Sequence, residues 1–561
     1  MALLLGVATS ELNAQDLTRI GKSSALKVSG GLSTSQLFYW ADGIQNRRSP
    51  FSYFLTGNVN FNVYELNIPL SFTFSNQTIS VQQPFNQYSL HPTYKWLTAH
   101  IGYTSMTFSP YTLNGHIFLG AGADASPNEK WKVSAMYGRL LRAVKPDTTN
   151  GRNQPAFEQW GYGLKAHYGD QSKFLDLTVF RAKDKVSSLP YVPEALNVRP
   201  QENLVLAIGG GASLIERLQV KYEIASSAIT SDTRAEKINS GNFFQAAGPL
   251  FTPRTSTSYY KAMKGALNYN AKNFVVGIGY ECIDPQYKTL GAYFFNNDLE
   301  NITLNGNLAL GGGKVNVGMS IGTQRDNLDN SKISTLRRSI TAVSVSFVPS
   351  QQVNISTSYS NFLTYTNIRS AFVKINQLTA YDNLDTLNYT QVSQNANANI
   401  NYMVRASKER RKSLNVNISY MKASDTQANA PQNSGTTFLN LNTAYSINFV
   451  ARKLTIAPSL NMSSISMAMN ATTIGPSLTI AKSSDNKKWR GSFTANGNRT
   501  YAESKWTSQV ITLRLTGGYT LQKKHNLNLS LVALNRAGAG LPAFNEFTGT
   551  VGYGYSFSRN F

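Results

Sequence analysis

Apolar and polar residues alternate strictly along many segments of this chain. In residues 66–74 every even position is apolar, and the odd positions carry Asn, Pro, Ser and Thr. The same division recurs in segments that begin at Leu414, Leu439, Ile511 and Leu527. A period of two is typical of a β-strand, because successive side chains point to opposite faces. The pattern therefore predicts many strands, each with one apolar and one polar face.

The connections between these segments form two sets that alternate along the chain. The short set comprises 126–130, 169–171, 215–217, 270–272, 311–313, 349–351, 407–412, 451–453, 484–488 and 522–525. The other set holds every long connection: about 143–158, 182–202, 230–258, 284–300, 325–336, 362–392 and 423–436. Short periplasmic turns and long extracellular loops are typical of transmembrane β-barrels, whose last strand descends to the periplasm.

Composition separates a barrel from a soluble β-sandwich, which also alternates. Hydrophobic residues make up 41% of the chain and charged residues only 15%, and no apolar run reaches the ~18 residues of a membrane-spanning helix. The polar faces carry chiefly Asn, Ser, Thr and Gly, whereas the outer face of a sandwich usually carries many Lys, Glu and Arg. We therefore predict an all-β fold, a single large antiparallel transmembrane β-barrel.

The strand number depends on two segments near the N-terminus. Counting residues 27–40 and the Pro84-interrupted segment 79–90 gives 26 strands, and omitting both gives 24. We expect 26, because residues 88–103 resemble a strand, a tight proline-containing turn and the next strand. No linker divides the 561 residues, so the barrel is expected to occupy 27–561.

The first residues have some features of an export signal. An apolar core at 2–8 precedes Asn13-Ala14-Gln15-Asp16, which predicts a signal peptide over 1–14 and a periplasmic segment over 15–26. No Lys or Arg precedes the apolar core and Leu12 is large for its position, which leaves open whether the signal is truncated at its N-terminus. The single cysteine, Cys282, excludes an intrachain disulfide and a cysteine-based metal cluster.

The chain ends in a strand with one aromatic face, because Val551, Tyr553, Tyr555, Phe557 and Phe561 all occupy odd positions. This segment resembles the C-terminal assembly signal of bacterial outer-membrane barrels. The resemblance implies recognition by the outer-membrane assembly machinery, and the four-residue tail 558–561 departs from the usual pattern. The residues that match the signal are Gly552, Tyr555, Phe557 and Phe561.

Segments 84–88, 109–122, 134–139 and 385–393 resemble porin-like outer-membrane β-barrel proteins of the Bacteroidota. The resemblance implies the outer membrane of a Gram-negative cell as the location. It implies no activity, and no functional residue is carried over from it.

Motifs for catalysis or cofactor binding are absent from the sequence. Gly311-Gly-Gly-Lys314 lacks the earlier glycine and the following Ser or Thr of a phosphate loop. The five histidines show no metal-ligand spacing, and His100 and His167 are expected to be polar residues of the lumen wall. We predict neither an enzyme nor a bound cofactor or metal.

The net charge of +23 is concentrated in part in the short turns. At a periplasmic rim these cations would meet anionic lipid headgroups or an acidic protein, and this position argues against nucleic acid. The residues of this basic rim are Lys408, Arg410, Arg411, Lys412, Lys487, Lys488, Lys523 and Lys524. Lys165, Lys221 and Arg514 are expected to face the lumen together with Asp176 and Glu223, which predicts a mild anion preference.

A barrel of this size leaves a lumen wider than that of porins with 16–18 strands. We therefore expect a conduit for polar solutes or exported substrates, restricted by inward-folded loops, of which 362–392 and 230–258 are the strongest candidates. The alternative is a scaffold that transports nothing and docks other outer-membrane or periplasmic proteins through its loops and basic rim.

Overall fold

The computed structural model describes residues 26–561 with several gaps. The gaps are 77–85, 147–154, 190, 193–195, 240, 242–243, 245–247, 249, 333–336, 362–393, 424–435 and 467–469. The predicted signal peptide and nearly all of the predicted periplasmic segment therefore lie outside the described residues, as does loop 362–392. Within the described ranges, no helix has the length and apolar character needed to cross a membrane.

The described chain is almost entirely β-strand. The strands are β1 (Leu26–Asp42), β2 (Phe51–Val63), β3 (Leu66–Ser75), β4 (Gln87–Leu90), β5 (Thr93–Tyr94), β6 (Leu97–Thr107), β7 (Asn114–Ala125), β8 (Trp131–Leu141), β9 (Glu158–Gly169), β10 (Lys173–Lys185), β11 (Glu202–Ile215), β12 (Leu218–Thr230), β13 (Thr257–Asn270), β14 (Phe274–Ile283), β15 (Leu299–Leu310), β16 (Val315–Arg325), β17 (Arg337–Ser350), β18 (Val353–Ser360), β19 (Gln394–Ala406), β20 (Arg410–Ala423), β21 (Thr436–Phe449), β22 (Leu454–Ser466), β23 (Ala471–Ser483), β24 (Trp489–Ala502), β25 (Lys505–Leu521), β26 (His525–Gly538) and β27 (Leu541–Asn560). Two short 3-10 turns, Val186–Ser188 and Gly311–Gly313, follow β10 and β15.

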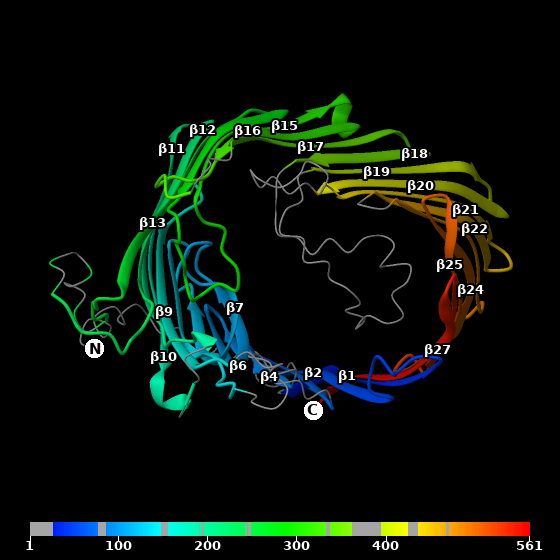
Figure 1. The fold of residues 1–561 in the computed structure, drawn as a ribbon, viewed down its shortest axis with the longest axis horizontal. Helices are drawn as coiled ribbons and strands as arrows, with labels where there is room; N and C mark the ends of the chain where they lie inside the picture. Colours follow the sequence, from blue (N-terminus) through cyan, green and yellow to red (C-terminus); the bar gives the residue numbers. More distant parts are fainter. Residues whose placement is uncertain are drawn as a thin grey trace.

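These strands form one closed antiparallel barrel, seen down its axis in Figure 1. Each strand pairs with its neighbours in the chain, and β27 closes the ring by pairing with β1 from Lys27↔Asn560 to Asp42↔Asn545. β4 and β5 share one position in the ring, because both pair with β3 and with β6. The barrel therefore has 26 strand positions, and the predicted fold class and strand number are confirmed.

The predicted proline-containing turn is wrong in its position. Pro92 lies in the two-residue gap between β4 and β5, and the chain reverses at Lys95 and Trp96, where Lys95 has a φ of 50°. Pro92 interrupts the strand because proline lacks the N–H that a central strand must donate. The carbonyl of Pro92 still accepts a hydrogen bond from the N–H of Ala99 at 2.9 Å, so the strand continues across the gap.

The predicted sorting of connections by length is present in the barrel. All the predicted short turns lie at one end, which we call the turn rim. The strand ends that the predicted long connections join all lie at the other end, which we call the loop rim. A few loop-rim connections are also short, such as Glu503–Ser504 between β24 and β25.

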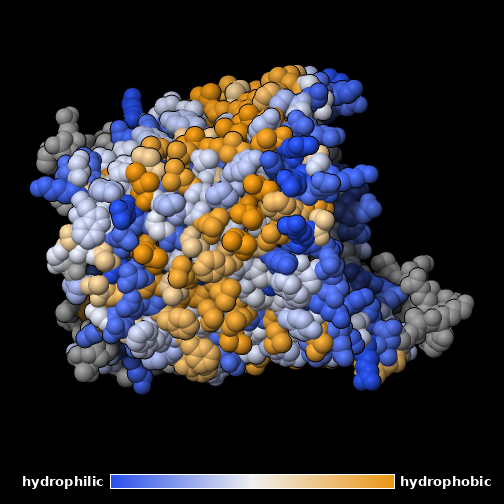
Figure 2. Space-filling view, turned by 90° about the vertical axis from the view of Figure 1, so that its right-hand side faces the viewer, coloured by the Kyte–Doolittle hydropathy of each residue, from blue (hydrophilic) through white to orange (hydrophobic). Residues whose placement is uncertain are grey.

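The outer surface carries an apolar belt. On β25, the side chains of Leu513 and Leu515 point outward, and these residues expose 43% and 46% of their surface. Thr512 belongs to the other face of the same strand and exposes 7%. Figure 2 shows hydrophobic residues gathered midway along the barrel axis, with hydrophilic residues toward both rims. Such a band matches the outer surface of a barrel embedded in a bilayer.

The six tryptophans of the chain divide between the two rims and are all exposed. Tryptophan prefers the membrane–water interface, because its ring is apolar and its N–H needs a polar partner. Trp40, Trp160 and Trp506 lie near the loop rim, and Trp96, Trp131 and Trp489 lie at the turn rim. The tryptophans therefore form two girdles that flank the apolar belt.

The described residues of the connection after β12 lie outside the barrel, so the expectation that 230–258 folds into the lumen is wrong. Phe244 and Phe251 are buried against Leu204 and Ala228. Leu204 shares the outward face of β11 with Ile208, which is 40% exposed. The reason is that the outer wall near the loop rim is apolar here and the two phenylalanines cover it. Figure 1 shows this connection outside the wall beside β13.

The first testable prediction concerns the two faces of β25. We expect Leu515→Arg to reduce the amount of folded barrel in the membrane, because an outward charge near mid-bilayer costs about 2–4 kcal/mol. Thr516→Arg is the matched control, because Thr516 lines the lumen hollow described below. Heat-modifiability gels of membrane fractions measure folded barrel. Equal losses in both variants would contradict the assignment of faces.

The second prediction concerns the closing strand. Deleting 550–561 removes the partners of Lys27–Leu37, which are 11 of the 16 residue pairs that join β1 to β27. Each backbone group left unsatisfied in hydrocarbon costs several kcal/mol, so we expect membrane insertion to be lost. A deletion of equal length within 362–392 is the control. Normal levels of the truncated barrel in the membrane fraction would show that closure by β27 is dispensable.

Candidate functional site

One loop-rim connection, residues 284–298, folds into the lumen and crosses the inner wall; we call it the strap. It leaves β14 and reaches the connection 108–113 between β6 and β7, as Figure 1 shows. The hydroxyl of Tyr287 donates to the Tyr111 carbonyl at 2.8 Å, and the Thr289 hydroxyl donates to the Thr112 carbonyl at 2.7 Å. The strap therefore joins two parts of the wall that lie several strands apart.

Between its ends the strap is bonded to the wall beneath it. The Leu290 N–H donates to Asn203 Oδ1 on β11 at 3.0 Å, and the Ser227 hydroxyl on β12 donates to the Lys288 carbonyl at 2.7 Å. Lys288 Nζ donates to Gln201 Oε1 at 3.0 Å. These hydrogen bonds use both backbone and side-chain groups of the strap and hold it against the wall. The strap therefore narrows the lumen at a fixed place.

A small hydrophobic core lies between the strap and the wall. Small wall side chains, Ala182, Ala225 and Ala262, leave room for the strap residues Tyr287 and Leu290. The connection 108–113 packs in the same way. A Cβ at Gly163 would come within 2.5 Å of the Phe108 ring, so glycine is required there for Phe108 to lie against β9.

Burial changes the ionisation of two strap residues. It raises the pKa of Tyr287, and the carboxylates of Glu223 and Asp284 raise it further. The phenol therefore remains protonated and available as a donor to Tyr111. Burial lowers the pKa of Lys288, an effect that the carboxylate of Asp184 partly offsets.

Charged side chains are paired along the wall on the turn-rim side of the strap. Lys165 Nζ lies 3.4 Å from Asp176 Oδ2 and donates to the Phe108 carbonyl at 2.7 Å. His167 Nδ1 lies 2.6 Å from Asp176 Oδ1. The Tyr111 hydroxyl donates to Glu281 Oε1 at 2.6 Å. We call this region, β6 to β14, the charged wall.

A histidine pair in the charged wall lies beside an aspartate and a serine, which are the residue types of a catalytic triad. Their arrangement, however, is not that of a triad. His100 Nε2 and the Ser134 hydroxyl both bond to Asp124, at 2.8 Å and 2.5 Å, and His91 Nδ1 lies 2.8 Å from His100 Nδ1. The serine hydroxyl bonds to the carboxylate, so no imidazole is placed to take its proton. In the described ranges, no three His, Cys, Asp or Glu side chains are arranged to hold a metal ion.

The opposite wall has a different chemistry. Strands β16 to β26 contain no Asp or Glu, and we call this region the carboxylate-free wall. Its inner face is rich in asparagine, and neighbouring amides bond to one another, as in Asn397 to Asn395 at 2.9 Å and Asn415 to Asn401 at 2.9 Å. Beside these asparagines a solute would meet neutral amides.

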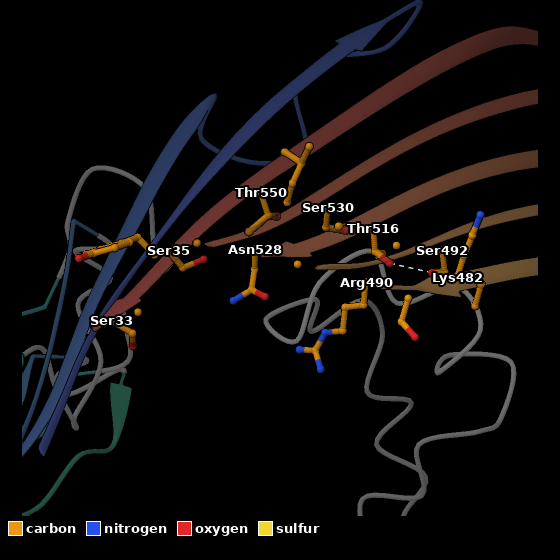
Figure 3. Close-up of a pocket in the computed structure, with 18 of the residues that line it drawn as sticks. Ser33, Ser35, Lys482, Arg490, Ser492, Thr516, Asn528, Ser530 and Thr550 are labelled. Atoms are coloured by element: carbon orange, nitrogen blue, oxygen red, sulfur yellow. Dashed lines mark hydrogen bonds between the residues drawn. The ribbon is translucent and has the colours of Figure 1, made fainter. Parts of the chain in front are cut away.

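A hollow of about 670 Å³ lies on the inner face between β22 and β1 and spans the closing seam. Figure 3 shows its lining, in which the Ser492 and Thr516 hydroxyls are joined by a 2.7 Å hydrogen bond. Arg490 projects into this hollow. The other polar side chains labelled there are Ser33, Ser35, Lys482, Asn528, Ser530 and Thr550. The lining contains no carboxylate, so the hollow suits a hydroxylated or anionic solute.

The structure does not bring together the basic residues that were predicted to face the lumen. Lys165 and Lys221 lie on β9 and β12 in the charged wall, where Lys165 is paired with Asp176. Arg514 lies on β25 in the carboxylate-free wall, on the same face as Thr516. The described lumen therefore divides into a charge-paired side and a side without carboxylates.

The predicted basic residues lie in and beside three turns of the turn rim, between β19 and β20, β23 and β24, and β25 and β26. Arg410 packs over the Phe449 ring at 5.4 Å. Among the predicted assembly residues, the rings of Tyr555 and Phe557 lie 5.7 Å apart, and the Phe561 N–H donates to the Leu26 carbonyl at 2.7 Å. Their roles in partner binding and assembly remain predictions.

Sequence reasoning missed the strap and the connection 108–113. A signal was present, because residues 287–295 contain four aromatic side chains in a connection that alternation predicts to be a loop. Aromatic residues seldom gather in a loop that remains in water. Such a cluster indicates a loop that packs against its own barrel.

The third prediction tests the attachment of the strap. Tyr287→Phe removes a donor and leaves the buried Tyr111 carbonyl unsatisfied, which costs about 1–3 kcal/mol. We expect faster hydrogen exchange at the Asn114 amide, which donates to the Gly291 carbonyl, while the barrel remains folded. Tyr519→Phe on the outer face is the control. Unchanged exchange at Asn114 would show that the Tyr287 hydroxyl does not hold the strap.

In comparisons with known proteins, the solved structures that match this chain have low sequence identity to it. No family model matches the chain, and no curated protein matches it. The P pilus usher (PapC) translocation pore is 10% identical with a TM-score of 0.34, covering 95% of this chain and 100% of that one. OccAB3 of Acinetobacter baumannii is 9% identical with a TM-score of 0.30, covering 69% and 100%. The FrpB iron transporter of Neisseria meningitidis (F5-1 variant) is 8% identical with a TM-score of 0.37, covering 94% and 82%.

Proposed function

We propose that this protein is an outer-membrane conduit for polar solutes, narrowed on one side by the strap. The observation that supports the proposal best is the division of the described lumen. The strap and its core occupy the side of β6 to β14, while the opposite side presents a polar hollow of about 670 Å³. A ring of 26 strands is larger than the porin rings that already leave an aqueous channel.

The apolar belt and the two tryptophan girdles support a position across a bilayer. By the rule that bacterial barrels carry short turns toward the periplasm, the loop rim faces the cell exterior. A solute then enters at the loop rim beside the strap and leaves among the basic turns. Those turns would contact anionic lipid headgroups or an acidic periplasmic protein.

A second function, a docking scaffold, draws support from two features. One is the arc of basic turns at the turn rim. The other is the connection 231–256, which covers the outer wall through Phe244 and Phe251. We favour the conduit because the polar lining of the hollow has no evident use in a barrel that only docks proteins.

The fourth prediction tests the conduit. In planar lipid bilayers, we expect the purified barrel to form stable open channels. Replacing 285–297 with an Asn-Gly turn should raise their conductance, because the strap leaves the lumen. The barrel can accept this change, since Ile283 already pairs with Leu299 and Asn-Gly suits a tight hairpin.

The matched control is a similar shortening within 231–256, on the outer wall. It should leave conductance unchanged. A correctly folded barrel that forms no channels, with or without the strap, would contradict the conduit and support the scaffold. Channels whose conductance is the same without the strap would show that the strap does not narrow the path.

A further inference from the structure

Three cationic residues lie close together at the turn rim: Arg405 on β19, and Arg410 and Lys412 on β20. Lys412 lies directly opposite Arg405 in the register, and Arg410 is two residues from Lys412 along β20. With ~4.8 Å between strands and ~3.3 Å per residue, the three Cα atoms lie within about 8 Å of one another. We call these three residues the cationic cluster.

The cationic cluster belongs to the outer face of the barrel. Arg410 and Lys412 share a face of β20 with Ile418, which is 36% exposed in the apolar belt. The other face of β20 carries Asn417, which lines a hollow on the inner wall. Arg410 also lies opposite Phe449 on β21. The side chains of Arg410 and Lys412 therefore point toward the membrane side of the wall and not into the lumen.

A β-bulge on β19 brings Arg405 to the same face. Met403 lies opposite Ser413 and Arg405 lies opposite Lys412, so Val404 is an extra residue between them. Without the bulge, alternation would give Arg405 the inward face of Met403, because the two are two positions apart. A bulge re-aims the side chain that follows it. Arg405 therefore points outward beside Lys412.

The cationic cluster is not compensated by neighbouring carboxylates. Of the described residues from 394 to 466, only Glu409, in the turn between β19 and β20, carries a carboxylate, and no ion pair joins it to the cluster. Like charges that lie directly opposite one another destabilise a strand pair. An anion bound between these side chains would remove that repulsion.

An aromatic ring supports one member of the cluster. The guanidinium carbon of Arg410 lies 5.4 Å from the centre of the Phe449 ring. The face of an aromatic ring attracts a cation but offers no oxygen to its N–H groups. A guanidinium is always charged and binds the oxygens of a phosphate through paired N–H donors. Arg410 is therefore held at the surface with donors that an anion can use.

The surface beside the cluster indicates which kind of anion fits. The outward residues that follow Lys412 along β20 are Leu414, Val416 and Ile418, which lead into the apolar belt. Tyr402 on β19 lies opposite Leu414 and is 41% exposed, as is typical of the membrane–water interface. A molecule bound here from the membrane side meets cations at one end and apolar side chains beyond them. A phospholipid has the matching distribution, with a phosphate above its acyl chains.

We propose that Arg405, Arg410 and Lys412 form a binding site for the headgroup phosphate of an anionic phospholipid in the leaflet at the turn rim. An anionic lipid suits the site better than a zwitterionic one, whose own ammonium would be repelled by three cations. The proposal goes beyond the conduit, since it requires a barrel in a bilayer but no passage of solutes. It also divides the predicted basic rim, because Arg411 points inward while Arg405 joins the outward cluster.

The experiment measures lipid binding to the full-length barrel in detergent by native mass spectrometry. Phosphatidylglycerol and phosphatidylcholine with the same acyl chains are the two probes. We expect the unmodified barrel to bind phosphatidylglycerol more tightly. Each Lys or Arg near an anionic lipid surface strengthens binding about fivefold. The triple variant Arg405→Gln, Arg410→Gln, Lys412→Gln should therefore bind phosphatidylglycerol roughly 100-fold more weakly, and bind phosphatidylcholine as before.

The matched control is Arg411→Gln, which removes one positive charge from the inward face of the same strand and should leave both affinities unchanged. Arg405→Gln alone disturbs the wall least and should weaken phosphatidylglycerol binding about fivefold. Equal affinity of the unmodified barrel for the two lipids would overturn the site, as would an unchanged affinity of the folded triple variant for phosphatidylglycerol. Loss of a co-purified acidic protein with lipid affinity unchanged would assign the cluster to a protein partner instead. Channel formation enters none of these outcomes, so the conduit stands or fails separately.

Discussion

The structure depends on the requirement that every backbone N–H and C=O in a bilayer finds a partner within the protein. Antiparallel pairing meets this requirement along each strand, but an open sheet leaves two unpaired edges. The pairing of β27 with β1 removes both edges, from Lys27↔Asn560 to Asp42↔Asn545. Closure also separates an outside, where alternate side chains form the apolar belt, from an inside, where the other half forms the lumen wall.

Within the closed ring the two sides of the lumen are used differently. The strap covers the side where Ala182, Ala225 and Ala262 leave room for it, and the buried core there makes the constriction rigid. Its polar atoms are paired, as in Tyr287 to Tyr111. The other side keeps short polar residues on its inner face. One half of the wall thus provides shape, and the other provides a polar surface that the proposed conduit would use.

The charged residues follow the same division, which shows where the basic residues of the chain are located. Acidic residues of the lumen gather in the charged wall, where Lys165 and His167 pair with Asp176. The strands of the carboxylate-free wall carry basic residues and no Asp or Glu, and its turns add further cations at the turn rim. The net charge of +23 is therefore distributed unevenly around the barrel.

The sequence by itself determined the strands, their faces and the sorting of connections, because alternation and turn length are local properties of the chain. The tertiary structure alone decided which connections enter the lumen. Tyr287 and Tyr111 are 176 residues apart, and Phe244 covers the outer wall through contacts with Leu204 that no local pattern specifies. The interior position of Pro92 likewise depends on register between strands. The register between strands is fixed by the closure of the whole ring. It therefore cannot be predicted from any single segment of the sequence.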